Sequence, residues 1–195
     1  PRARDHFLAS VVGNRLVLAG GRTTDLPNPF DKTIPEVDVY DFTSGTWKTL
    51  DENLPTQRAG TMTVPIGRHV VVMGGESSAM TLAHGEVEAL DVFAERWITL
   101  PSLVTPRHSG GVGVLDGRVF VAAGAGNQGG SPELSTAELL AASDVLSAEP
   151  LNLIVNGGFQ RGLEGWAVAG SAELVADAGI EAPSLRLVAG TVLRS

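Results

Sequence analysis

The feature that most constrains this chain is a pattern written three times, in which an arginine is followed sixteen residues later by a glycine pair. The arginines and pairs are Arg4 with Gly20-Gly21, Arg58 with Gly74-Gly75, and Arg107 with Ala123-Gly124, where alanine replaces the first glycine. A short alternating segment follows each pair, and these segments lie fifty residues apart, at 36–40, 86–90 and 136–140. A period of about fifty residues built from short strands predicts blades of a β-propeller.

Composition favours an all-β protein and argues against several partners. The 195 residues are 43% hydrophobic and 18% charged, with 24 glycines and 11 prolines, which suits many short strands and tight turns. A net charge of −8 without a basic cluster argues against a nucleic-acid partner. No apolar run reaches the length of about eighteen residues that predicts a membrane span. Without cysteine the chain has no disulfide and no thiolate metal site.

Each repeat divides into short strands joined by tight turns. Apolar residues alternate on either side of Gly13-Asn14 in the first repeat, and equivalent turns fall at Gly67 and at Asp116-Gly117. A fourth strand is marked by Trp47 and Trp97, again fifty residues apart, but no tryptophan follows in the third repeat. Since four strands make one blade, we expect two complete blades and a third without its fourth strand.

These residues resemble the kelch repeat family, in which an arginine starts the blade and a glycine pair ends its second strand. An apolar or aromatic residue seven positions before the tryptophan, as Tyr40 and Leu90 are here, completes the resemblance. It implies a partial kelch-type β-propeller of about three four-stranded blades over residues 1–142, the C-terminal part of a larger propeller whose closing strand lies upstream of Pro1. Unpaired edges promote aggregation, so we expect another chain or missing residues to cover the open edges.

A different segment follows the repeats. Residues 143–150 are interpreted as a linker, and LNLIVNGGFQRGLEGW then begins a segment at 151–195 without the fifty-residue period. This opening resembles that of the jelly-roll β-sandwiches found among carbohydrate-binding modules. The resemblance implies a truncated jelly roll, because 45 residues are too few for an eight-stranded double sheet. It also implies an extracellular or cell-surface protein.

The repeats align one acid with each arginine, and we expect the two to pair inside each blade. The expected pairs are Arg4 with Asp38, Arg58 with Glu88, and Arg107 with Glu138. An unpaired buried charge would be costly. The alternative is that the three arginines line a central channel and hold an anionic ligand.

The sequence contains no constellation that indicates a reaction. The four histidines do not share the close spacing of zinc ligands, so no metal site or cofactor is predicted. Ser77, Ser78 and Ser109 lack a Gly-x-Ser-x-Gly context. Copper radical oxidases also carry kelch propellers, but the resemblance would require a crosslinked Tyr and Cys, and this chain has one Tyr and no Cys. We predict no catalytic residue.

The loops after the glycine pairs, at 22–35, 76–85 and 125–135, are the best candidates for a binding site, because propeller loops gather on one face. The predicted ligand-binding residues are Arg22, Asp25, Asn28, Glu76, Asn127 and Gln128, with ordinary solvated loop residues as the alternative. The leading hypothesis is a non-catalytic extracellular binding or adhesion protein that recognises a glycan or a protein. The alternatives are an enzyme (a propeller hydrolase, sugar mutarotase or oxidase) whose active site lies in blades absent from this chain, and a structural subunit of a surface assembly.

Overall fold

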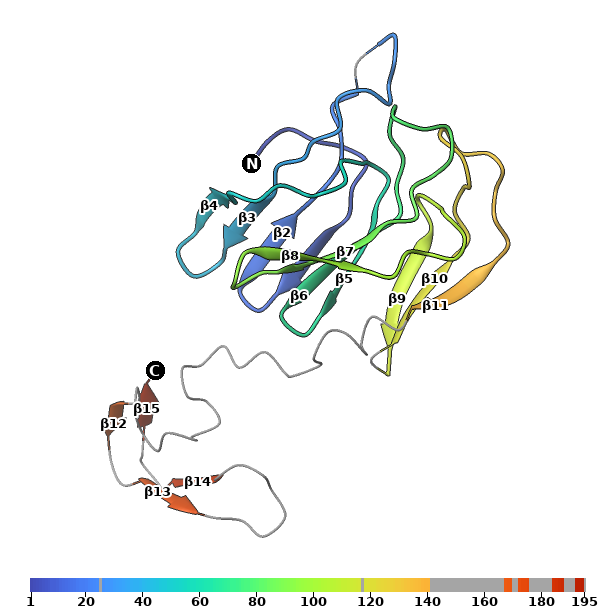
Figure 1. Cartoon of the computed structure of the whole chain (residues 1–195). Helices are drawn as coiled ribbons and strands as arrows, with labels where there is room; N and C mark the ends of the chain where they lie inside the picture. Colours follow the sequence, from blue (N-terminus) through green and yellow to red (C-terminus); the bar gives the residue numbers. More distant parts are fainter. Residues whose placement is uncertain are drawn as a thin grey trace. The chain divides into compact units, whose positions relative to one another are not determined.

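The computed structural model describes residues 1–24, 26–116 and 118–140, together with the backbone of four short strands between 167 and 194. The described residues form β-strands, turns and loops, and they contain no helix. The all-β prediction is therefore confirmed. The chain divides into two compact units, Pro1–Glu149 and Pro150–Ser195 (Figure 1).

The first two repeats each form a four-stranded antiparallel sheet in which every strand pairs with the next one in sequence. The first sheet contains β1 (Ala9–Val12), β2 (Arg15–Leu18), β3 (Asp38–Asp41) and β4 (Thr46–Thr49). The second sheet contains β5 (Met62–Ile66), β6 (His69–Met73), β7 (Val87–Asp91) and β8 (Arg96–Leu100). The acids that the repeat aligns, Asp38 and Glu88, lie on the third strand of their sheets.

The third repeat forms a three-stranded antiparallel sheet in the order β11-β10-β9. Its strands are β9 (Gly111–Leu115), β10 (Arg118–Ala122) and β11 (Ala137–Leu140). A tryptophan marks the fourth strand in the first two repeats, and its absence here predicted three strands. The described part of this repeat has these three strands. Glu138 pairs with Val121 across β10 and β11, so the third aligned acid also lies on a third strand.

The second unit contains two short antiparallel strand pairs. The pairs are β12 (Ala167–Ala169) with β15 (Val192–Arg194), and β13 (Ala172–Val175) with β14 (Ser184–Leu187). The predicted linker at 143–150 and the opening motif at 151–166 lie outside the described residues. The jelly-roll assignment therefore stays a prediction.

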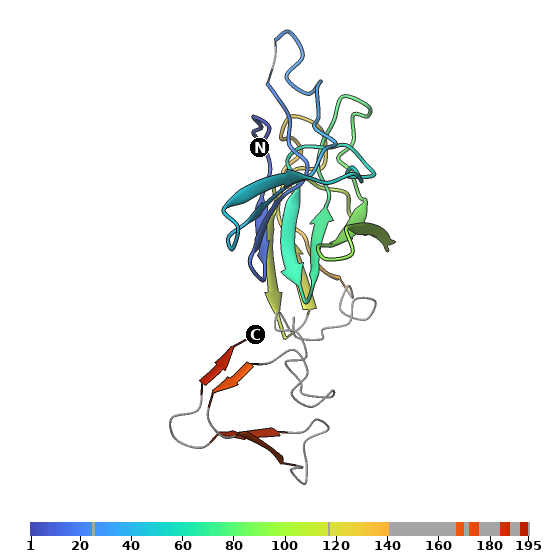
Figure 2. The same cartoon turned by 90° about the vertical axis from the view of Figure 1, so that its left-hand side faces the viewer.

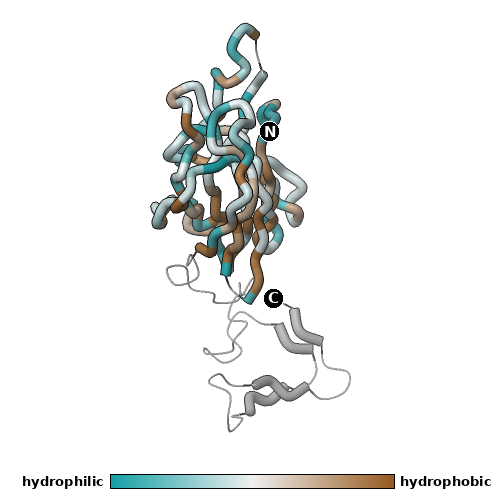
Figure 3. The backbone as a smooth tube through the Cα atoms, turned by 90° about the vertical axis from the view of Figure 1, so that its right-hand side faces the viewer, coloured by the Kyte–Doolittle hydropathy of each residue, from teal (hydrophilic) through white to brown (hydrophobic). Residues whose placement is uncertain are grey.

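The main hydrophobic core of the first unit lies between the second and third sheets. Val71 and Ala89 of the second sheet pack in one cluster with Val119, Val121 and Leu140 of the third, and all five are buried. Apolar residues that alternate along a strand share one face, which explains how β10 buries Val119 and Val121 and exposes Phe120. In Figure 3 the longest brown, apolar stretches lie in the middle and lower part of the first unit.

The loops and hairpin turns of the first unit lie at opposite ends of the sheets. The turns between the first two strands of each sheet lie at the lower end in Figures 1 and 2, and the loops after the glycine pairs lie at the upper end. Gly13 and Gly67 have positive φ angles of 60° and 54° at these turns, which glycine adopts without strain. The hairpin geometry thus directs all three long loops to one end.

Successive repeats are joined by the same backbone hydrogen bonds. The second glycine of each pair donates to the carbonyl of the next repeat's arginine, from Gly21 to Arg58 and from Gly75 to Arg107, at 3.0 Å in both cases. Because the same contact joins the first sheet to the second and the second to the third, each sheet is placed on the next in the same way. The loop ends of the three sheets therefore lie together.

Candidate functional site

The arginine that begins the second repeat is fully buried and held on several sides. The Arg58 Nη1 atom lies 2.6 Å from Oε2 of Glu88, and Nε donates to the Gly74 carbonyl at 2.6 Å. The same guanidinium also donates to the carbonyls of Thr56 and Val72, at 2.6 and 3.1 Å. These charge-assisted hydrogen bonds are buried, so the Arg58 side chain has a structural role in holding its sheet together.

The other two aligned pairs have the same geometry. Arg4 Nη2 lies 2.7 Å from Asp38 Oδ2, and Arg107 Nη2 lies 2.9 Å from Glu138 Oε1. Burial alone would raise the pKa of Asp38, but hydrogen bonds from the backbone N–H of Arg2 and from Thr49 and Arg4 outweigh it and lower that pKa. The arginine side chains are at most 1% exposed, so their charges face the sheets' own acids and carbonyls.

Two of the predicted ligand-binding residues bind each other across the first two repeats. Arg22 Nη1 donates to Glu76 Oε1 at 2.9 Å, and the two residues are 6% and 1% exposed. The second carboxylate oxygen of Glu76 accepts the backbone N–H of Gly129, in the third repeat, at 2.8 Å. Glu76 therefore connects the loops of all three repeats from a buried position.

The third loop is held by one contact to the second loop and by one within its own repeat. The Gln128 side-chain amide donates to the Ser77 carbonyl at 2.8 Å, and His108 Nε2 lies 2.9 Å from the Asn127 carbonyl oxygen. Asn28 is exposed, and its Oδ1 accepts the backbone N–H of Phe30 at 3.1 Å. Asp25 lies outside the described residues. The structure thus joins Arg22, Glu76, Asn127 and Gln128 in one network and leaves Asn28 apart from it.

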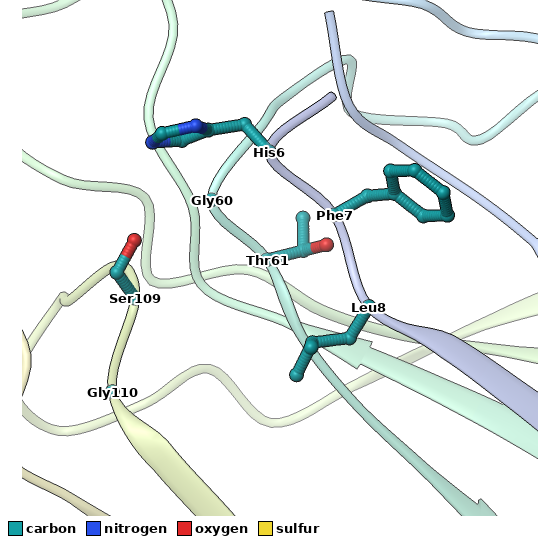
Figure 4. A pocket seen from close by; sticks show the side chains of 7 residues that line it. All are labelled: His6, Phe7, Leu8, Gly60, Thr61, Ser109 and Gly110. Carbon is teal, nitrogen blue, oxygen red and sulfur yellow. The ribbon is translucent and has the colours of Figure 1, made fainter. Parts of the chain in front are cut away.

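A first pocket, of about 290 Å³, lies where the three repeats begin. Its lining residues are His6, Phe7, Leu8, Gly60, Thr61, Ser109 and Gly110 (Figure 4). His6, Gly60 and Ser109 each stand two positions after a repeat arginine and have positive φ angles of 57°, 63° and 53°. A positive φ is strained for residues other than glycine, so this pocket displays a histidine and a serine from an uncommon backbone conformation.

A second pocket, of about 490 Å³, lies between the loops of the first two repeats. The first loop contributes Asp31, Lys32 and Thr33, the second contributes Ser77, Ser78, Ala79 and His84, and the rest of the lining is Pro55, Thr56 and Gln57. This pocket lies within the loops that the sequence predicted, but its lining residues were not among the predicted ones. Their position in the loops at 22–35 and 76–85 is the sequence signal that could have indicated seven of them, and Pro55, Thr56 and Gln57 carry no such signal.

The described residues show no group of three or more His, Asp or Glu side chains arranged to hold a metal ion. A search of the same residues for a helix long and apolar enough to cross a membrane finds none. The linings of the two pockets offer hydrogen-bonding groups, the imidazoles of His6 and His84, the charged Asp31 and Lys32, and small apolar surfaces.

Comparison with known proteins gives kelch-repeat relatives. The chain is 26% identical over 126 residues to the Kelch-like protein terF of Aspergillus terreus, which covers 64% of this chain and 27% of that protein. It is 28% identical over 121 residues to Kelch repeat protein C2 of Vaccinia virus and, equally, of Cowpox virus, covering 62% of this chain and 22% of each protein. No protein-family model matches the chain.

The chain has a kelch-like β fold. The relatives and the antiparallel sheets agree on this, and the repeat arginines and glycine pairs lie where the kelch resemblance implied. The chain spans about a quarter of the length of the curated relatives it matches.

Proposed function

We propose that this chain is part of a kelch-type β-propeller that binds a protein partner through the loops that follow the glycine pairs and does not cleave that partner. The propeller arrangement is supported by the identical step between successive repeats, in which the Gly21 and Gly75 N–H groups each donate to the next repeat's arginine at 3.0 Å. The protein partner is supported by the kelch-repeat relatives.

The observation that carries this proposal is the buried contact of Glu76 with Arg22 and with the backbone of Gly129. It joins loops from three repeats that are separated by more than fifty residues, and it holds them before any ligand arrives. A preorganised surface loses less conformational entropy on binding than a mobile one. In this role Arg22 and Glu76 support the binding surface, and the exposed residues at the two pockets contact the partner.

We also propose that further blades cover the two outer sheets. In the first sheet Val11 and Trp47 are 49% and 40% exposed, and in the third sheet Phe120 and Leu139 are 44% and 48% exposed. The second and third sheets bury equivalent strand residues against each other, so another sheet of the same kind is the natural cover. The extracellular location, the glycan ligand and the surface-assembly role stay predictions from the resemblances.

A random-peptide display selection on the full chain tests the loop-face proposal. We expect enriched peptides that bind the wild-type chain and lose at least tenfold in affinity for Lys32→Ala or Gln57→Ala at the second pocket. His6→Asn probes the first pocket, because asparagine tolerates the left-handed backbone. Thr46→Ala, on exposed strand β4, is the matched control and should bind as wild type.

Three outcomes of this selection would contradict the proposal. Peptides that bind all pocket variants and Thr46→Ala equally would place the binding surface elsewhere. Failure to enrich peptides, together with binding on a glycan array that the same variants abolish, would favour the glycan alternative. Chemical conversion of a bound peptide would replace binding with enzymatic turnover.

A further inference from the structure

Ser77, His84 and Glu86 form a continuous hydrogen-bonded relay at the second pocket. Ser77 Oγ lies 2.8 Å from His84 Nε2, and His84 Nδ1 lies 3.1 Å from Glu86 Oε2. The serine hydroxyl, the imidazole and the carboxylate thus stand in the order found where a serine acts as a nucleophile with a histidine base. Ser77 meets the network around Glu76 through its backbone carbonyl, which accepts the Gln128 amide, and its hydroxyl is engaged with His84 instead.

The protonation states of the relay suit this chemistry. Burial lowers the pKa of His84, so the imidazole is neutral at pH 7. For Glu86, burial would raise the pKa, but a hydrogen bond to its own backbone N–H and the neighbouring His84 outweigh it, so the group is a carboxylate. A carboxylate accepts a hydrogen bond from Nδ1–H, and the Nε2 lone pair is then left to accept the Ser77 hydroxyl proton.

The relay is positioned by the surrounding backbone and opens to a pocket. Ser77 and His84 are each 4% exposed, yet both line the cavity of about 490 Å³. The Ala79 N–H donates to Ser77 Oγ at 3.3 Å, and the Gln128 amide holds the Ser77 carbonyl at 2.8 Å. These contacts fix the serine oxygen beside the histidine, as a preorganised nucleophile requires.

We infer that Ser77 is a nucleophile that accepts acyl groups from esters bound in the second pocket, with His84 as its general base and Glu86 as a positioning residue. Ser77 Oγ forms a bond to the acyl carbon, its proton passes to His84 Nε2, and the ester C–O bond breaks as the leaving alkoxide takes that proton. Water then attacks the acyl-serine, again through His84, and releases the acid and the free serine. Lys32 and Gln57 line the same pocket and carry N–H donors of the kind that stabilise the oxyanion.

This inference goes beyond the binding function, and it reverses the conclusion drawn from the sequence about Ser77. The residue has no Gly-x-Ser-x-Gly context, but the loop from 76 to 85 folds back so that His84, seven residues later, reaches it. The relay therefore depends on loop conformation and leaves no motif in the sequence.

A fluorophosphonate probe, which bonds to a nucleophilic serine with loss of fluoride, tests the inference on the full chain. We expect labelling at Ser77 by peptide mass spectrometry and slow release of p-nitrophenol from p-nitrophenyl acetate. Ser77→Ala should abolish both signals. Ser44→Ala is the matched control, because Ser44 lies in the exposed turn between β3 and β4, outside both pockets, with its hydroxyl 2.7 Å from Thr46 Oγ1, and it should react as wild type.

The histidine and the carboxylate are tested by rate and by pH. His84→Gln should slow labelling by about 10²-fold or more, the usual contribution of a general base. The charged groups acting on His84 are Glu86, Glu88 and Arg58, and the Glu86 carboxylate raises the histidine pKa. Glu86→Gln should therefore move the pH of half-maximal labelling downward, which a purely structural role would not do.

The inference is overturned if Ser77 is unlabelled in the folded wild-type chain, or if labelling survives Ser77→Ala. Circular dichroism of each variant shows whether it folds. If His84→Gln does not fold, the pH shift in Glu86→Gln decides the matter, and an unchanged pH profile there removes the relay from the reaction.

Discussion

Glu88→Gln perturbs the buried ion pair of the second sheet while keeping the side chain's size. Arg58 is 0% exposed and Glu88 4% exposed at the side chain, and their charged atoms are 2.6 Å apart. The variant leaves the arginine charge buried without its partner, which costs about 3–5 kcal/mol. Natural domains are stable by about 5–15 kcal/mol, so this loss is a large fraction of the total.

Urea unfolding followed by circular dichroism measures the effect. With a slope of about 2 kcal/mol per molar urea, the expected loss lowers the midpoint by about 2 M. The matched control is Glu95→Gln, which breaks the Lys48–Glu95 pair, also at 2.6 Å but with side chains 59% and 28% exposed. Exposed pairs contribute at most about 1 kcal/mol, so the control midpoint should barely move.

Equal midpoint shifts in the two variants would refute this reasoning, because the buried pair is expected to lose far more stability than the exposed one. A second check replaces both partners, with Arg58→Met and Glu88→Leu in one chain. Removing the whole pair takes away the unpaired charge, so this double variant should be more stable than Glu88→Gln. If it is less stable, the carbonyl contacts of Arg58 to Gly74 and Thr56 outweigh the ion pair.

Two further predictions concern stability. Gly74→Ala should lower the free energy of unfolding in urea by more than about 2 kcal/mol, because alanine is strained at this positive φ and the added Cβ would collide with the Arg107 carbonyl oxygen. Gly113→Ala, where a Cβ meets nothing within 4 Å, should change it by less than about 1 kcal/mol, and equal losses in the two variants would contradict this. Burial lowers the pKa of His84 and His69 below 6.5, so below pH 6.5 the unfolded chain binds protons that the folded chain does not. The free energy of unfolding should therefore fall as pH drops below 6.5, less steeply in His84→Gln, and an unchanged slope in that variant would exclude His84 as a source.

The sequence by itself determined the strand layout of the first unit. Alternation, turn glycines and the fifty-residue spacing are read from the sequence alone, and they predicted the two four-stranded sheets and the three strands described in the third. The same spacing predicted that Arg58 pairs with Glu88, because an arginine and an acid each recur at a corresponding place in every repeat. Patterns of this kind depend on residues close in sequence, so they predict strands without knowledge of the tertiary structure.

Only the tertiary structure decided what the loops do. Arg22 and Glu76 are separated by 54 residues, and they meet because one sheet packs beside the next at a fixed step. Sequence analysis named both as ligand contacts, since two charges in polar loops look exposed until their packing is known. The pocket beside them and the path from Ser77 to His84 arise in the same way, because the backbone conformation of an irregular loop is set by the surfaces it packs against.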